Sequence, residues 1–145
     1  MHSIFCRRSL KERALFSRST LKGQVLLHDE LLLHRAFSVL PFSTKRLRDA
    51  ELFFQHVPLP QKAIICCATP QTISTRIAGR KTVPNCYKGL SPKELDRLLS
   101  ELVEACFIAQ DVLTSRGLPC TLLSLDEAIE INCTRLEEIC LQVQA

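Results

Sequence analysis

Tryptophan is absent from this chain, tyrosine occurs once, and glycine occurs only four times in 145 residues. Aromatic platforms that stack the bases of single-stranded nucleic acid therefore have little to be built from. Loops that cradle a dinucleotide or a phosphate need glycine so that the backbone can approach the phosphate. The composition argues against both kinds of site, and we expect no cofactor.

Long apolar runs and metal-ligand spacings are also missing. No apolar stretch reaches the roughly 18 residues that a membrane-spanning helix needs, so we expect no integral membrane segment. No Cys-x-x-Cys occurs, which is the spacing typical of zinc ribbons and thioredoxin-type sites. We therefore expect no metal site, and thiols that pack as small apolar side chains. The eight cysteines are Cys6, Cys66, Cys67, Cys86, Cys106, Cys120, Cys133 and Cys140.

Charge is divided unevenly along the chain. Residues 1–48 carry ten Lys and Arg against three Asp and Glu, whereas residues 91–145 carry four against ten. Residues 1–22 are rich in Arg and Ser and contain one acid, Glu12, which is typical of a mitochondrial transit peptide. Arg35-Ala36-Phe37-Ser38 resembles the site after which matrix presequences are cut. The sequence therefore predicts a basic segment over residues 1–37 that directs the chain to the mitochondrial matrix.

The alternative is a basic N-terminal arm of a bacterial or viral protein, located in the cytoplasm of the bacterium or the infected cell. In that case the very apolar residues 24–40 form a buried helix. Under either interpretation, residues 38–145 have the length of one small domain.

The middle of the chain predicts one helix and up to two short strands. Pro41 breaks the apolar segment, and Ser43 or Thr44 can then cap a helix over residues 45–56. The apolar run 63–68 lies between Pro60 and Pro70 and has the length of a buried strand. Residues 72–77 are rich in β-branched side chains, which favours a second strand.

The last third of the chain, residues 91–145, predicts two helices. Ser91-Pro92-Lys93-Glu94 places a cap, a proline and a glutamate where a helix begins. Apolar residues then recur with the helical period until Gly117 and Pro119. Ser124-Leu125-Asp126-Glu127 predicts a second capping box and a second helix. The fold class is therefore mainly α, with a C-terminal antiparallel helical hairpin in which Leu102 and Leu136 are buried.

Candidate catalytic groups find ready structural explanations. Cys66 and Cys67 follow a strand and could use His56 as a base, but a reactive thiol needs an electropositive setting that the sequence does not supply. Ser91 and Ser124 are explained by helix capping, and the ten acids of the last third fall mostly on polar helix faces. We expect no catalytic residues and a protein that is not an enzyme.

Apolar residues outside the helical stripes indicate a protein-binding surface. Phe107 projects roughly 140° from the centre of the first stripe, at about 100° per residue. Other apolar residues also lie off the stripes, and Asn132 lies inside the second stripe, where a buried amide needs a partner. Because a hairpin covers one face of each helix, residues 40–77 of the same chain, a second copy or a partner protein must cover the others. We expect a partner protein, or a second copy, to cover the predicted partner-binding residues: Val103, Phe107, Ile108, Ile131 and Leu141.

A basic segment offers a weaker signal for RNA. Arg76, Arg80, Lys81 and Lys88 lie within 13 positions of one another, and phosphate contacts need only Lys and Arg. The pattern is more typical of a solvated loop. We therefore expect a non-enzymatic accessory or assembly subunit of a larger mitochondrial complex. The alternatives are an RNA-associated subunit, such as a mitochondrial ribosomal protein, and a bacterial or viral helical adaptor or chaperone.

Overall fold

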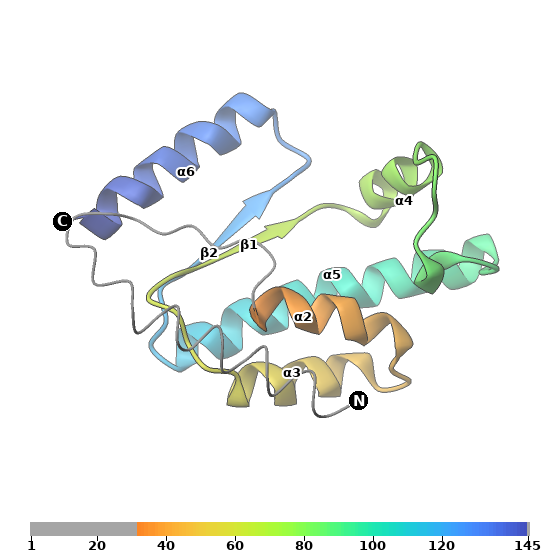
Figure 1. Ribbon diagram of the computed structural model, residues 1–145, viewed down its shortest axis with the longest axis horizontal. Helices are drawn as coiled ribbons and strands as arrows, with labels where there is room; N and C mark the ends of the chain where they lie inside the picture. Colours follow the sequence, from red (N-terminus) through yellow and green to blue (C-terminus); the bar gives the residue numbers. More distant parts are fainter. Residues whose placement is uncertain (1–31, 145) are drawn as a thin grey trace.

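The computed structural model describes residues 32–144, which form a mainly helical fold around a pair of short strands (Figure 1). Three helical segments precede the first strand, a short helix follows it, and the longest helix leads to the second strand. In chain order the elements are α2 (Leu32–Val39), η1 (Leu40–Phe42), α3 (Arg46–His56), β1 (Ala63–Cys67), α4 (Pro70–Ala78), η2 (Asn85–Tyr87), α5 (Pro92–Ser115), β2 (Cys120–Ser124) and α6 (Ile129–Gln144).

The strands β1 and β2 pair in parallel, with Ala63 opposite Cys120 and Cys67 opposite Ser124. A parallel pair needs a crossover connection because the chain must return to the same end of the sheet. Helices α4 and α5 supply that crossover. The predicted strand at 63–68 is confirmed as β1, whereas β2 was not anticipated.

One face of the strand pair packs against α5, α3 and α2. Ala63, Ile65 and Cys67 alternate along β1 into a core that also contains Leu102 and Leu113 of α5. Leu102 is therefore buried, as the sequence predicts, but it packs in a sheet–helix core. The apolar stripe of α5 is confirmed by its buried residues Leu98, Leu99, Leu102, Ala105, Cys106, Ala109 and Leu113.

Both ends of α5 follow the sequence signals. The Ser91 side chain accepts the Glu94 N–H, and the Glu94 carboxylate accepts the Ser91 N–H at 2.8 Å, which completes the predicted capping box. At the other end Gly117 adopts a φ of 79°, a left-handed conformation that a residue with a Cβ adopts only at a cost,. The helix therefore stops where the sequence predicts.

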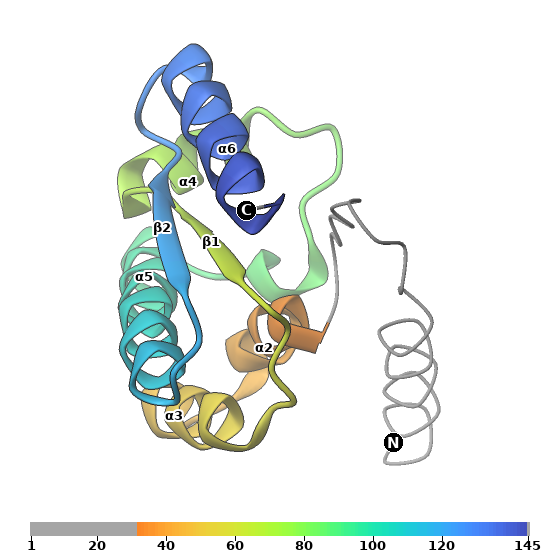
Figure 2. The same cartoon turned by 90° about the vertical axis from the view of Figure 1, so that its left-hand side faces the viewer.

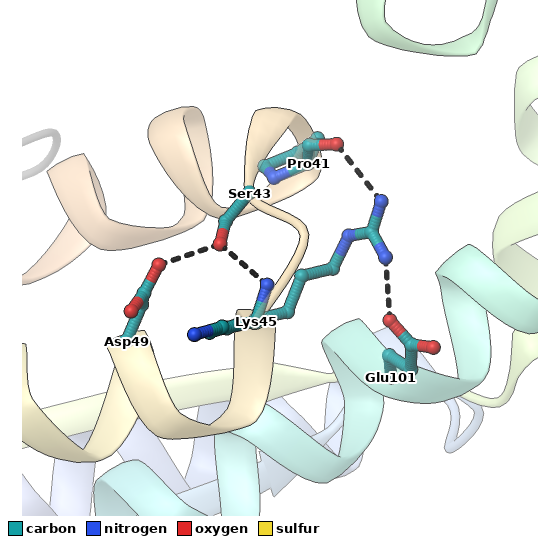
Figure 3. Close-up of polar contacts among 6 residues, drawn as sticks. Pro41, Ser43, Lys45, Asp49 and Glu101 are labelled. Atoms are coloured by element: carbon teal, nitrogen blue, oxygen red, sulfur yellow. Dashed lines mark hydrogen bonds and ion pairs between the residues drawn. The ribbon is translucent and has the colours of Figure 1, made fainter.

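Helix α3 is tied to α5 by polar contacts at both of its ends. Arg46 donates to the Glu101 carboxylate at 2.6 Å and to the Pro41 carbonyl at 3.2 Å (Figure 3). Arg116 donates to the carbonyls of Phe54 and Val57 at the far end of α3. These contacts satisfy carbonyls that the end of a helix leaves without intrahelical partners.

The predicted helix over 45–56 is confirmed, but its predicted cap is not. No side chain caps the first turn of α3. Ser43 instead accepts the Lys45 N–H at 2.9 Å and donates to the Asp49 carboxylate (Figure 3). The serine therefore fixes the turn that leads into the helix.

Helix α6 lies on the other side of the strand pair from α3 (Figure 1). Leu123 of β2, which alternates away from the α5 face, is almost completely buried, and Asn132 and Ile139 of α6 are buried as well. The Asn132 amide donates to the Ser124 carbonyl at 2.8 Å. This bond ties α6 to the end of β2.

The predicted strand over 72–77 is wrong, because these residues belong to α4. The Thr69 hydroxyl caps this helix by accepting the Thr72 N–H, and Pro70 occupies its first turn. A cap followed by proline fixes a helix start. Here that local signal outweighs the β-propensity of the threonines and isoleucines that follow.

The C-terminal antiparallel hairpin is not confirmed. Residues 120–124 form β2 between α5 and α6, so the chain passes through the sheet before α6 begins. The predicted capping box at Ser124 is wrong for the same reason, since Ser124 ends a strand and α6 starts at Ile129. Leu136, expected in the hairpin seam, is half-buried.

The proposed boundary between residues 37 and 38 falls inside α2. Ala36 is 3% exposed and belongs to the main core, and the Phe37 ring lies 6.0 Å from the Phe54 ring. Residues 36 and 37 therefore contribute to the packing of the domain. The transit-peptide composition of residues 1–31 lies outside the described residues.

Candidate interaction surfaces and polar clusters

The outer face of α5 carries the single aromatic side chain of that helix, Phe107. Phe107 is 48% exposed, although it lies only one residue from the buried Cys106. Val103, one turn earlier, is half-buried and packs against the main core. Glu104 and Asp111, three and four residues from Phe107, are exposed. Phe107 and Val103 thus form a small apolar strip with acidic side chains beside it.

Ile108 does not join this strip. By the helical turn of about 100° per residue, Ile108 points to the opposite flank of α5, toward the side that carries Glu101. Ile108 is half-buried, and Glu101 binds Arg46 of α3. The α5 residues that the sequence grouped into one surface therefore lie on two flanks of the helix.

Helix α6 exposes Ile131 and Leu141, which are 48% and 66% accessible. They are ten residues apart, or about 15 Å along a helix axis, and the exposed Glu137 and Glu138 lie beside Leu141. Single apolar residues on a surface are common, and a contiguous patch is the stronger sign of binding. The α6 positions are therefore weaker candidates for a binding centre than the Phe107 strip.

Exposed apolar residues that the sequence analysis missed lie at the junction of α2 and α3, within α3 and at the start of α6. Val39 and Phe42 are 50% and 69% exposed, Leu52 of α3 is 44% exposed, and Ile129 of α6 is 71% exposed. Pro41 signals the break in the helix, but no periodic pattern covers such a short segment. Nothing in the sequence distinguishes these residues from the neighbouring Leu40, which is buried.

The basic residues proposed for RNA have different environments. Arg76, in the last turn of α4, donates to the Leu125 carbonyl at 2.9 Å and so helps to join α4 to the segment after β2. Arg80, Lys81 and Lys88 are exposed, and within residues 32–144 their side chains make no hydrogen bond or ion pair. Arg76 is therefore explained by the fold, whereas the other three remain accessible cations.

A polar cluster joins the carboxyl ends of the two strands. The Asp126 carboxylate accepts the Thr69 N–H at 2.8 Å and the Thr69 hydroxyl at 3.2 Å. The pKa of the Asp126 carboxyl lies below its ordinary value, chiefly because of a hydrogen bond with the Thr72 hydroxyl, and also because of the Thr69 bonds. Ligands of parallel sheets commonly bind at this edge, beside a helix N-terminus. Here Asp126 itself occupies that position, which indicates a structural role.

Two buried thiols face each other between β1 and α5. Cys67 and Cys106 are each 8% exposed, and their thiols donate to the Ala68 carbonyl at 3.8 Å and to the Leu102 carbonyl at 3.5 Å. The neighbouring Cys106 side chain lowers the pKa of Cys67 to about 7 against the opposing effect of burial, while the Cys67 side chain and burial raise the pKa of Cys106. His56, considered as a base, is exposed, and its Nδ1 lies 2.8 Å from the Leu52 carbonyl within α3. His56 is therefore engaged within α3 and is not positioned as a base for the two thiols.

Metal and membrane features are absent from the described part of the chain. Across residues 32–144 no group of three or more His, Cys, Asp or Glu side chains has the arrangement of a metal site. No helix in the same range is long and apolar enough to cross a bilayer.

Comparisons with known proteins add no relative. No protein-family model matches the chain, and no curated protein or solved structure is significantly similar to it.

Proposed function

We propose that this chain is a non-enzymatic accessory or assembly subunit of a larger complex, and that it binds a partner protein through the outer face of α5. The observation that carries the proposal is the exposure of Phe107 on a helix whose opposite face is fully buried. Aromatic side chains dominate the energetics of protein interfaces. A half-exposed phenylalanine on a rigid helix is therefore a plausible anchor.

The surroundings of Phe107 define the chemistry of the partner. Val103, one turn earlier, packs against the core, and Glu104 and Asp111 place negative charge beside Phe107. Interfaces combine an apolar centre with a polar rim. The fitting partner is an apolar pocket flanked by Lys or Arg, with Ile131 and Leu141 of α6 as separate, secondary contacts.

The test is recovery of partners by a tagged full-length chain expressed at its natural level. Phe107→Ala should lose a partner that the unchanged chain retains, while the melting temperatures of the two chains agree within about 2 °C. Thr114→Ala is the matched control, because it removes a small side chain from an exposed position of the same helix. Equal recovery by the Phe107→Ala chain would overturn the proposed surface.

We place the complex in the mitochondrial matrix because of the Arg- and Ser-rich start of the chain,. Residues 1–40 fused to a fluorescent protein should accumulate in mitochondria. The N-terminus of the endogenous protein should also be determined. An intact N-terminus on a cytosolic protein would instead favour the bacterial or viral adaptor, in which residues 1–40 belong to the fold.

The RNA-associated subunit is the second candidate, and the accessible cations Arg80, Lys81 and Lys88 favour it. Phosphate contacts release counterions, so RNA affinity should fall steeply as salt rises. Replacing Lys81 and Lys88 by Gln should reduce the slope of that dependence. A chain that binds RNA with unchanged affinity and salt slope after these substitutions would exclude this segment as the contact.

A further inference from the structure

The outer edge of β2 has unpaired backbone groups. The Ala63 N–H donates to the Pro119 carbonyl, and the Leu125 N–H donates to the Cys67 carbonyl. These two bonds show which residues of each strand direct their backbone N–H and C=O toward the other strand. In a parallel ladder these facing residues alternate. Thr121 and Leu123 therefore face β1, and the N–H and C=O of Leu122 point outward, where no described residue bonds to them.

Such an edge is unusual for a folded domain. Sheets in globular proteins commonly have four to six strands, and parallel sheets are normally covered on both sides. Edge strands of stable monomers usually carry lysine, proline or a bulge that prevents pairing with another chain. The five residues of β2 are uncharged and contain none of these, and the nearest proline, Pro119, precedes the strand.

The accessible groups form a short window that is complementary to itself. The outward residues are Cys120, Leu122 and Ser124, and among their backbone groups the Ser124 carbonyl already accepts the Glu127 N–H and the Asn132 amide. The groups without a partner among the described residues are the N–H and C=O of Cys120, the N–H and C=O of Leu122 and the Ser124 N–H. An antiparallel copy of this window, centred on Leu122, pairs Leu122 with Leu122, and the Ser124 N–H with the Cys120 C=O.

Symmetry also favours the antiparallel arrangement of two copies. A parallel arrangement of this edge would not close into a symmetric dimer. The charged groups that flank β2 do not decide the orientation, because Arg116 donates to the Phe54 and Val57 carbonyls and Glu127 binds Arg135 within the same chain.

The geometry points to a homodimer in which β2 of one chain pairs antiparallel with β2 of a second copy, so that the two strand pairs form one four-stranded sheet. Figure 2 shows β1 and β2 side by side, with the connection from α3 running into the start of β1. This inference concerns a different surface from the Phe107 strip, and it stands or falls independently of the proposed partner.

The test is the mass of the full-length chain in solution, measured by sedimentation or light scattering from about 5 to 500 μM. The average mass should rise from 16.4 kDa toward twice that value. Leu122→Pro removes the outward N–H without removing a β1–β2 bond, so it should remain monomeric throughout. Leu122→Ala is the matched control: it loses the side chain, retains the N–H and should still dimerise.

A mass that does not change with concentration would overturn the proposal, and so would equal dimerisation of the proline and alanine chains. Because Leu122→Pro could fail to fold, amide exchange of the unchanged chain supplies a second measurement. The Leu122 N–H should exchange fast in dilute solution and slowly in concentrated solution. Protection that persists on dilution would mean that the same chain covers the edge, and exchange that is fast at every concentration would mean that nothing covers it.

The arrangement can be tested separately from the mass. Antiparallel pairing places residue 124 of one copy opposite Cys120 of the other, so mild oxidation of a Ser124→Cys chain should give a covalent dimer. The same chain with Cys120→Ser should give much less. A yield that does not depend on Cys120 would contradict the antiparallel register.

Discussion

Helices α5 and α6 have similar sequence signals but very different surroundings. Each carries an apolar stripe, and each follows a Ser-x-x-Glu tetrad. In α5 seven residues are buried, and the helix contacts α3, α4 and both strands. In α6 the buried residues among those with described burial are Asn132 and Ile139. The difference teaches that a stripe predicts which face of a helix turns inward, whereas the amount of burial depends on what the fold places opposite it.

The largest effect expected from this comparison is at Leu102. Leu102→Asp puts a charge into the apolar core between α5 and the strands, and should cost about 3–5 kcal/mol of unfolding free energy. Urea denaturation followed by circular dichroism measures it. An unchanged midpoint would show that α5 is not the centre of the core.

The matching substitution in α6 should be milder. Leu136 is half-buried, so an aspartate there can reach water. Leu136→Asp should therefore cost about 1–2 kcal/mol, measured by the same denaturation. A loss equal to that of Leu102→Asp would mean that α6 is as strongly held as α5, and the comparison would fail.

Asn132 sharpens the comparison because it is the polar contact that ties α6 to β2. Its amide donates to the Ser124 carbonyl, while its Oδ1 has no hydrogen-bond partner. Asn132→Ala should cost about 1 kcal/mol. Asn132→Leu should cost less, because it also removes the unsatisfied oxygen and the Ser124 carbonyl keeps the Glu127 N–H. If both variants lose the same stability, the side-chain hydrogen bond is not what holds α6.

The sequence predicted the parts of the fold that depend on local signals. The capping box at Ser91, the stop at Gly117 and the strand at 63–67 all follow from residues close together in the chain. The sequence did not predict β2, because the strand character of residues 120–124 depends on pairing with β1 more than 50 residues earlier. The Ser124 tetrad has the composition of a helix start, and only that distant partner makes its serine the end of a strand.

The candidate surfaces show the same limit. Phe107, Ile131 and Leu141, which helical angles place outside the predicted stripes, are exposed. In α6, however, Ile129 and Cys133 of the predicted second stripe are exposed as well. The same angles place Ile108 on the other flank of α5 from Phe107, but they could not show that Arg76 is engaged by the Leu125 carbonyl. The Thr69–Asp126 cluster and the Cys67–Cys106 pair each join residues far apart in the chain, so no spacing rule identifies them.

The thiol pair should give α5 a pH-dependent contact that α6 lacks. The pKa of Cys67 falls from 9.0 to about 7 in the folded chain. The Cys67 thiol therefore loses its proton at a lower pH in the folded state than in the unfolded state. The free energy of unfolding should consequently rise between pH 7 and pH 9, by on the order of 1 kcal/mol. The contribution is lost as pH falls through 7. Above pH 9 the raised pKa of Cys106 opposes it.

The measurement is the urea midpoint of the reduced chain at several pH values between 6 and 9. Cys67→Ser should flatten the rise. Cys133→Ser is the matched control, since Cys133 is an exposed thiol of α6. A rise that survives Cys67→Ser would assign the pH dependence to another group.

The smallest effect on stability is expected at the exposed apolar positions of the two helices. Phe107→Ala and Leu141→Ala should each change the unfolding free energy by less than about 0.5 kcal/mol, because surface substitutions away from caps and core contacts usually do. The two variants should nevertheless differ in partner recovery. Phe107 has the core-packed Val103 one turn earlier and acidic side chains beside it, whereas Leu141 has Glu137 and Glu138 one turn earlier. If Phe107→Ala destabilises the isolated chain as much as a core substitution does, its ring is part of the core and the proposed binding surface loses its anchor. If Leu141→Ala is the variant that abolishes partner recovery, the weakly held helix α6 carries the interaction.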